Sequence, residues 1–247
     1  VNAAWVRRFA PAADERTIGH RLAGGYSRSE IDAEARASSA TVEGAFAAVY
    51  GGASAGGVNV RGGAAFAVNS VETSRSPAFG TLTDQLDAGY DGSTAQAFGE
   101  IGYAIPLGSG IVEPFAGGAV VRVHTDAFAE DGGPAALRGA SRDNDLATTT
   151  LGVRTEWEFG LLPLRVRASA AWQHSFGDLA PTQSLAFRAG SAGFEIGGVP
   201  VERDALLAEF GLHVGISEDA GFDVAYTGSL GPDAQVHAVS GRFATRF

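Results

Sequence analysis

The sequence predicts an all-β fold, an antiparallel transmembrane β-barrel of the outer-membrane type with about 10–12 strands, a polar lumen, short periplasmic turns and long extracellular loops. Three observations favour it. Side chains alternate between apolar and polar along many segments, these segments run to a dozen or more residues, and the connections between them alternate between short and long. Soluble strands usually have about 5–6 residues, whereas a tilted strand that crosses the hydrocarbon layer needs about 9–11.

The alternation is clearest in residues 144–159. Thr150 and Arg154 share one parity there, and Leu151 and Val153 share the other. Successive side chains of a strand point to opposite faces, so the polar parity is expected in the lumen and the apolar parity against lipid. Long loops are expected at residues 74–93, 127–143 and 177–203, with tighter connections elsewhere. The expected strands are residues 21–31, 41–51, 58–73, 94–105, 111–126, 144–159, 164–176, 204–216, 222–230 and 234–247.

Composition excludes several classes of function. The 247 residues carry a formal net charge of −10, whereas a nucleic-acid partner requires a cationic face. The chain has no cysteine, which excludes disulfides, thiolate zinc sites and cysteine nucleophiles. No run of about 18 apolar residues occurs, so no transmembrane helix is expected. The five histidines stand apart in the sequence, and neither a metal site nor a cofactor is expected.

The C-terminal strand carries the most specific signal. It is an alternating strand that closes on an aromatic residue, and it resembles the C-terminal assembly signal of outer-membrane barrels. The physical interpretation is an edge strand whose unpaired backbone groups are bound by strand addition during assembly. An ordinary edge strand that happens to end the chain is the alternative. The residues of this signal are Val239, Gly241, Phe243, Thr245 and Phe247.

Several segments together resemble the translocator β-domain of autotransporters, the type Va secretion family. They begin at Leu22 (LAGGYSRS), Thr94 (TAQAFGEIGY), Val112 (VEPFAG), Trp172 (WQHSFGD) and Val239 (VSGRFATRF), and the likeness runs in order through residues 18–247. The resemblance implies a twelve-stranded barrel in the outer membrane of a Gram-negative bacterium, a helix in its lumen, and an N-terminal passenger delivered to the cell surface. Only ten strands are expected in residues 18–247, so residues 1–17 are interpreted as a linker remnant or abbreviated first strands.

The resemblance also implies the partners. They are outer-membrane lipid and lipopolysaccharide, the protein's own passenger, the barrel assembly machinery and periplasmic chaperones, and the barrel is expected to be a monomer without enzymatic activity. A stand-alone porin or adhesin, with the long loops as its binding element, is the alternative. An enzyme with catalytic loops would need a clustered acid, base and nucleophile, and the sequence offers no such pattern.

Charged side chains on the polar parity are expected to face the lumen, although any barrel needs a wet polar interior. Residues 111–126 are ambiguous, because Glu113 and Arg122 fall on opposite phases. A bulge, or an interfacial Glu113, would explain this. The lumen candidates are Glu100, Arg122, Arg154, Glu156, Arg165, Arg167, Glu209, Arg242 and Arg246. The expected aromatic girdle consists of Tyr103, Trp157, Phe159, Trp172 and Phe222.

Overall fold

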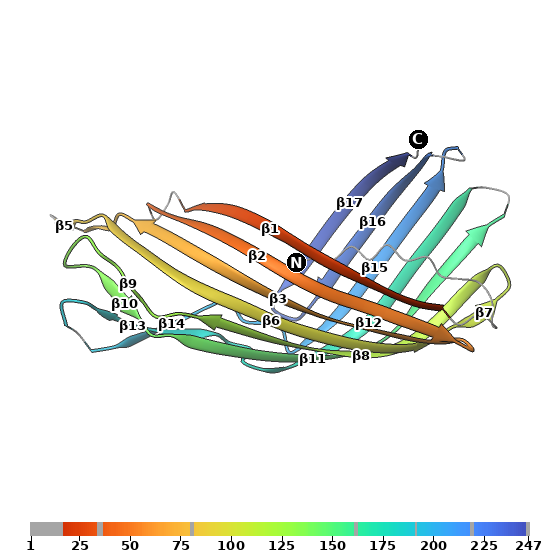
Figure 1. Ribbon diagram of the computed structural model, residues 1–247, viewed down its shortest axis with the longest axis horizontal. Coiled ribbons are helices and arrows are strands. Elements are labelled where there is room, and N and C mark those ends of the chain that lie inside the picture. Colours follow the sequence, from red (N-terminus) through yellow and green to blue (C-terminus); the bar gives the residue numbers. More distant parts are fainter. Residues whose placement is uncertain are drawn as a thin grey trace.

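The computed structural model describes residues 17–33, 37–79, 82–160, 163–190, 192–217 and 220–245. Over these residues the regular structure consists of β-strands, and ten of them form one antiparallel path that curves into a half-barrel (Figure 1). The described part contains no helix long and apolar enough to cross a membrane. In path order the strands are β1 (Thr17–Ala33), β2 (Ser38–Ala55), β3 (Val58–Arg75), β6 (Leu86–Tyr103), β8 (Gly110–Thr125), β11 (Arg142–Phe159), β12 (Leu164–Gly177), β15 (Asp204–Gly215), β16 (Ala220–Leu230) and β17 (Gln235–Thr245).

The wall strands confirm the predicted fold class, and most of them extend beyond an expected bound, whereas β15 and β17 do not. The largest difference is β6, which begins at Leu86, whereas the sequence predicted a loop up to residue 93. The first residues of β6 include Asp87 and Asp91, which interrupt the apolar parity, so a search for lipid-facing alternation does not recognise this part of the strand. A strand that continues past the hydrocarbon layer meets water on its outer face, so charged residues are tolerated there. A short strand, β7 (Ile105–Leu107), also pairs with β8 where the sequence predicted a turn.

Strand pairing separates an apolar face from a polar face along most of the wall. Directly paired residues share a face, and neighbouring strands pair one-to-one without interruption. Leu151 lies opposite Trp172 on the apolar face, whereas Arg61 lies opposite Glu100 on the polar face. Large apolar side chains are exposed on the apolar face, among them Leu22 and Phe66. This is the arrangement of a wall that faces lipid on one side, because a soluble fold would bury these rows.

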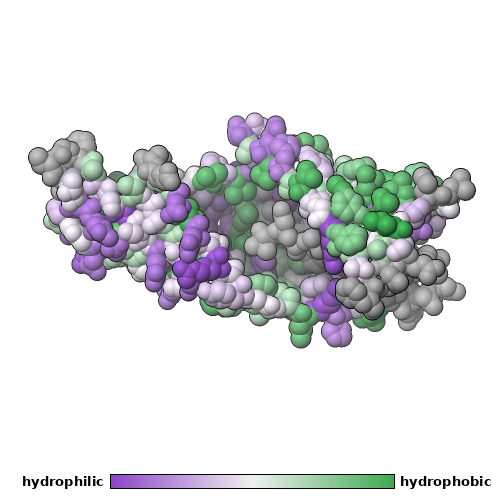
Figure 2. All heavy atoms as spheres, turned by 90° about the horizontal axis from the view of Figure 1, so that it is seen from above, coloured by the Kyte–Doolittle hydropathy of each residue, from purple (hydrophilic) through white to green (hydrophobic). Residues whose placement is uncertain are grey.

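The long connections carry strands of their own at the end opposite the tight turns. A second sheet, here called the loop sheet, has the order β14–β13–β10–β9 and lies at the left of Figure 1. Hydrophilic residues dominate the same end in Figure 2. The sequence predicted plain loops there, because these strands are short and pair between separate connections. The strands of the loop sheet are β9 (Phe128–Ala129), β10 (Leu137–Gly139), β13 (Thr182–Phe187) and β14 (Phe194–Gly197). A separate pair consists of β4 (Ala78–Phe79) and β5 (Leu82–Thr83).

An ion pair ties this end to the wall. Arg75, the last residue of β3, donates from Nε and Nη2 to the two carboxylate oxygens of Glu130, both at 2.6 Å. Glu130 is buried and also accepts a hydrogen bond from the backbone N–H of Leu137 at 2.7 Å. A buried carboxylate needs such donors, and here they join β3 to the connection between β8 and β11.

Candidate functional site: an ion-pair cluster on the polar face

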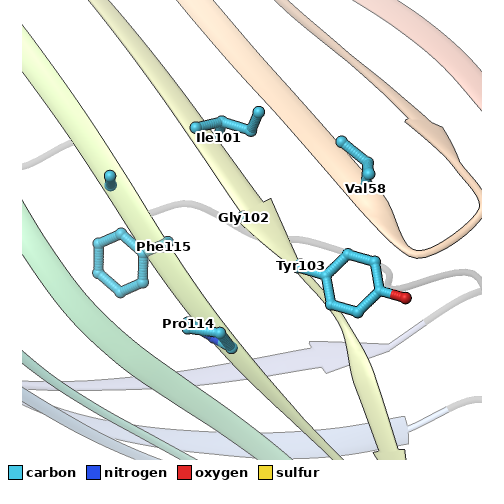
Figure 3. A pocket seen from close by; sticks show the side chains of 7 residues that line it. Val58, Ile101, Gly102, Tyr103, Pro114 and Phe115 are labelled. Atoms are coloured by element: carbon cyan, nitrogen blue, oxygen red, sulfur yellow. The ribbon is translucent and has the colours of Figure 1, made fainter.

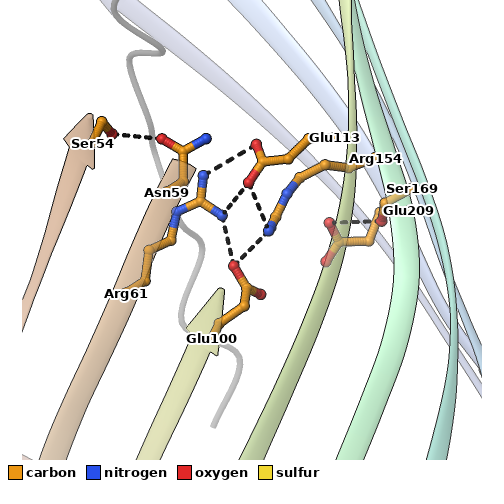
Figure 4. A network of polar contacts seen from close by, with 8 residues as sticks. All are labelled: Ser54, Asn59, Arg61, Glu100, Glu113, Arg154, Ser169 and Glu209. Atoms are coloured by element: carbon orange, nitrogen blue, oxygen red, sulfur yellow. Dashed lines mark hydrogen bonds and ion pairs between the residues drawn. The ribbon is translucent and has the colours of Figure 1, made fainter. Parts of the chain in front are cut away.

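Four charged side chains from four adjacent strands form a closed cluster on the polar face (Figure 4). Arg61 on β3 donates from Nη1 to Glu100 Oε1 at 2.6 Å, and the same nitrogen lies 3.2 Å from Glu113 Oε1. Arg154 on β11 places Nη2 at 2.5 Å from Glu100 Oε1 and 3.3 Å from Glu113 Oε1. Each carboxylate is therefore shared by two guanidinium groups, and the cluster is neutral as a whole.

Burial makes this cluster different from a surface ion pair. The Glu113 side chain is 1% exposed, and the side chains of Arg61, Arg154 and Glu100 are 12%, 19% and 20% exposed. The Phe115 ring covers Arg154, with 4.1 Å between the guanidinium carbon and the ring centroid. Buried charges are tolerated when they are paired and hydrogen-bonded, so each member depends on the other three.

Glycine makes room for the cluster at two positions. A Cβ at Gly102 would collide with the Glu113 carboxylate, which lies on the neighbouring strand. A Cβ at Gly152 would lie 2.5 Å from the Cβ of Ala171 and 2.8 Å from the Phe115 ring that packs over Arg154. Glycine is useful inside a strand where another group approaches the backbone closely, and here those groups are the Glu113 carboxylate at Gly102 and the side chains of Ala171 and Phe115 at Gly152.

A second group of predicted residues lies on the same face, on β11, β12 and their neighbours. Glu156 Oε1 lies 3.2 Å from Arg165 Nε, and Arg165 Nη2 lies 2.5 Å from Glu158 Oε1. Glu156 Oε2 is buried and has no hydrogen-bond partner. Because Arg165 is substantially exposed, this group is looser than the cluster around Glu113.

The remaining polar-face candidates lie farther along the wall. Arg167 Nη2 lies 4.0 Å from Asp223 Oδ1, and Arg242 lies opposite Asp223 in the register of β16 and β17. Glu209 accepts a hydrogen bond from Ser169 Oγ at 3.4 Å (Figure 4). Arg246 lies outside the described residues.

The prediction that Arg122 faces the lumen is wrong, because this residue lies on the apolar face. Its strand pairs one-to-one with both neighbours, which places Arg122 opposite Ala95 and Asp145 and leaves no bulge. It donates to both carboxylate oxygens of Asp145 at 2.7 Å, and its side chain is 63% exposed. Glu113 is the charged residue of this strand that faces the polar side. Arg122 stands three residues from the loop-side end of β8, where the outer face no longer needs to be apolar.

Sequence reasoning missed Arg61. A lone arginine in a glycine-rich and alanine-rich strand carried no signal by itself. The pairing of β3 with β6 places it directly opposite Glu100. β3 and β6 are joined by a long connection, so no tight turn fixes which of their residues lie opposite each other, and no pattern in the sequence indicated this pair.

The five girdle candidates all lie on the apolar face. Tyr103, Trp157, Phe159 and Phe222 lie near the tight-turn ends of their strands, and Trp172 lies toward the loop side of β12. The Tyr103 ring flanks a shallow depression on this face between β3, β6 and β8 (Figure 3). Aromatic rings at the two rims of an apolar band are typical of a membrane-spanning barrel.

The C-terminal strand β17 is an edge of the described wall. Phe243, Gly241 and Val239 share the apolar face and lie opposite Phe222, Val224 and Tyr226 of β16. Thr245 has the same parity and lies opposite Ala220, whereas Phe247 lies outside the described residues. In the part of the chain that the structure describes, no group of three or more His, Cys, Asp or Glu side chains is placed to hold a metal ion.

An antiparallel wall of long strands, apolar on one face and ion-paired on the other, defines the wall of an outer-membrane β-barrel. Comparison with known families identifies the kind of barrel. The family model for the autotransporter beta-domain matches residues 17–227, and the chain belongs to this family.

Two curated relatives support this assignment. Both are described as extracellular serine proteases of Serratia marcescens, one 32% identical over 90% of this chain and the other 30% identical over 81%. The chain spans about a fifth of the length of these relatives, 21% and 19%. Among solved structures, the translocator domain of the autotransporter NalP from Neisseria meningitidis is similar in fold. It has a TM-score of 0.60 and 14% identity, with 94% of this chain and 86% of that chain covered.

The chain is thus an outer-membrane translocator domain of an autotransporter, a domain that anchors and exports an N-terminal passenger in a Gram-negative bacterium. The prediction of the family, the fold class and the location is confirmed.

Proposed function

We propose that the polar face lines a water-filled bore, and that the ion-pair cluster holds the shape of this bore while an exported polypeptide passes along it. The observation that carries the proposal is the closed cluster, which joins four strands and whose charged groups form ion pairs with one another. Toward the loop side the polar face of β11 presents Thr148 and Thr150, which are small and uncharged. Such a wall is wetted by water without holding a passing chain through strong ionic contacts.

We also propose the finer division of roles. The translocator carries no catalysis of its own, and the activity named for the Serratia relatives resides in the part of those chains that this domain does not match. The apolar face is the contact surface for outer-membrane lipid and lipopolysaccharide. The strand edge of β17 is the element that the barrel assembly machinery binds, through its backbone groups and the row that includes Phe243.

A pair of matched substitutions tests the bore. Thr150→Trp adds a large side chain to the polar face, and Leu151→Trp adds one to the apolar face of the same strand. In planar lipid bilayers, the refolded chain is expected to conduct ions, with a lower single-channel conductance for Thr150→Trp and an unchanged one for Leu151→Trp. A chain that inserts without conducting, or a conductance that Leu151→Trp lowers as much as Thr150→Trp, would contradict the proposal.

A further inference from the structure

The loop sheet has one edge joined to the barrel wall and one free edge. On the joined side, the backbone N–H of Asp87 donates to the carbonyl of Asp131 at 3.0 Å, and the N–H of Asp131 donates back at 2.9 Å. On the other side, β14 pairs with β13 and with no further strand among the described residues. The chain after β14 bonds back toward the β13 side, where the N–H of Gly198 donates to the carbonyl of Pro181 at 2.7 Å. No strand of the described ranges therefore pairs with the outer side of β14.

An apolar row crosses the loop sheet and ends uncovered at this edge. It starts in the wall, where Tyr90 stacks on Phe128 with 5.2 Å between ring centroids. It continues through Leu185, which is 7% exposed, to Phe194 directly opposite on β14, which is 38% exposed. Ile196 lies on the same face of β14 and is 50% exposed. The row is buried in the middle of the sheet and exposed at its edge, where one more strand would cover Phe194 and Ile196.

The free edge is only partly protected against strand addition. β14 is a short strand with one charged residue, which limits strand addition, but it contains no lysine or proline. Its one charged residue, Glu195, alternates with the apolar residues and lies 3.5 Å from Ser184 Oγ on the other face. An extended segment with alternating apolar and polar residues would therefore match both faces of this edge.

We propose that β14 is a docking edge on which an extended segment of the exported polypeptide adds as a fifth strand of the loop sheet. The inference rests on the proposed function, because that function brings the exported chain past this end. The matched region makes up only 21% of one Serratia relative, so most of a chain of that kind lies outside the translocator. The recognition is a backbone ladder along β14, with apolar side chains of the segment beside Phe194 and Ile196.

Cross-linking to a synthetic peptide tests the docking edge without any export step. The chain has no cysteine, so a single introduced cysteine is an unambiguous probe. The probe is a short peptide of alternating threonine and valine with one central cysteine, added to the chain in lipid vesicles together with a mild external oxidant that accepts the two electrons released as the disulfide forms. Ile196→Cys is compared with Val199→Cys, a control in the same connection whose parent residue is more exposed, at 83% against 50% for Ile196. Disulfide formation at position 196 is expected to exceed that at 199 by about an order of magnitude. Equal yields would overturn the proposal.

Export kinetics then separate the docking edge from the conduit. A cysteine-free reporter is fused ahead of Val1, and its appearance at the cell surface is followed for the parent chain, Ile196→Lys and Val199→Lys. A lysine in the edge is expected to slow the reporter several-fold, and the control is expected to match the parent. Equal rates for all three would overturn the docking edge and leave the conduit standing. A parent that conducts ions yet never displays the reporter would overturn the export function and the docking edge together.

Discussion

Two arginine–carboxylate sites on opposite faces of the wall use the same bonds in different surroundings. In the cluster around Glu113 and in the Arg122–Asp145 pair, the shortest nitrogen–oxygen distances are nearly equal, at 2.5 and 2.7 Å. The Glu113 side chain is buried between two arginines, whereas Arg122 and Asp145 are both more than half exposed. Breaking a buried pair leaves an uncompensated charge and costs about 3–5 kcal/mol, whereas an exposed pair contributes about 0–1 kcal/mol. Burial, more than bond length, decides which of the two sites holds the wall together.

The largest effect is expected from Glu113→Gln. This substitution keeps the shape of the side chain but leaves two guanidinium groups with one carboxylate, so we expect it to lower the free energy of unfolding by about 3–5 kcal/mol. Urea unfolding in lipid vesicles, followed by tryptophan fluorescence, measures it.

Glu209→Gln is the matched control for this experiment. It makes the same chemical change on the same face, at a residue whose partner in Figure 4 is Ser169. We expect a change below about 1 kcal/mol, as for an exposed polar contact. Equal destabilisation by the two substitutions would mean that closure of the cluster has no special role.

An intermediate effect is expected from Gly102→Ala. The new methyl group would displace the Glu113 carboxylate, so we expect a loss of about 1–3 kcal/mol in the same unfolding assay. Gly99→Ala on the same strand is the control, because a Cβ there meets no atom within 4 Å. The cost of Gly102→Ala should shrink in a Glu113→Ala background, since the clash is then removed. An undiminished cost would place the strain elsewhere.

The smallest effect is expected at the exposed pair. Arg122→Ala, Asp145→Ala and the double variant form a cycle whose coupling free energy should be about 1 kcal/mol or less. A coupling free energy as large as the loss of about 3–5 kcal/mol expected for Glu113→Gln would show that the outer face at Arg122 is as poorly hydrated as the cluster is.

The amino-acid pattern predicted the wall better than the site. Alternation assigned Glu100 and Arg154 to the polar parity, and the structure brings both into one cluster. It did not identify Arg61, because nothing in one strand tells which residue of the next strand lies opposite. The prediction for Arg122 failed for a related reason. β8 carries charged residues on both of its faces, and only the pairing with β6 and β11 decides which of these faces the lumen.

The loop sheet shows the same limit at longer range. Residues 127–143 and 177–203 were predicted as plain loops, yet β10 and β13 pair across them. Strands of three to six residues give too short a pattern to recognise, and their stability comes from the partner strand and from the burial of Leu185.

By itself, the sequence determined that the chain is built of long alternating strands with a lipid-facing and a water-facing side, because alternation is a property of a single strand. The tertiary structure alone decided which charges meet, which edge of the loop sheet stays open, and on which face Arg122 lies. These depend on the register between strands that are distant in sequence, and register is set by turns and pairing.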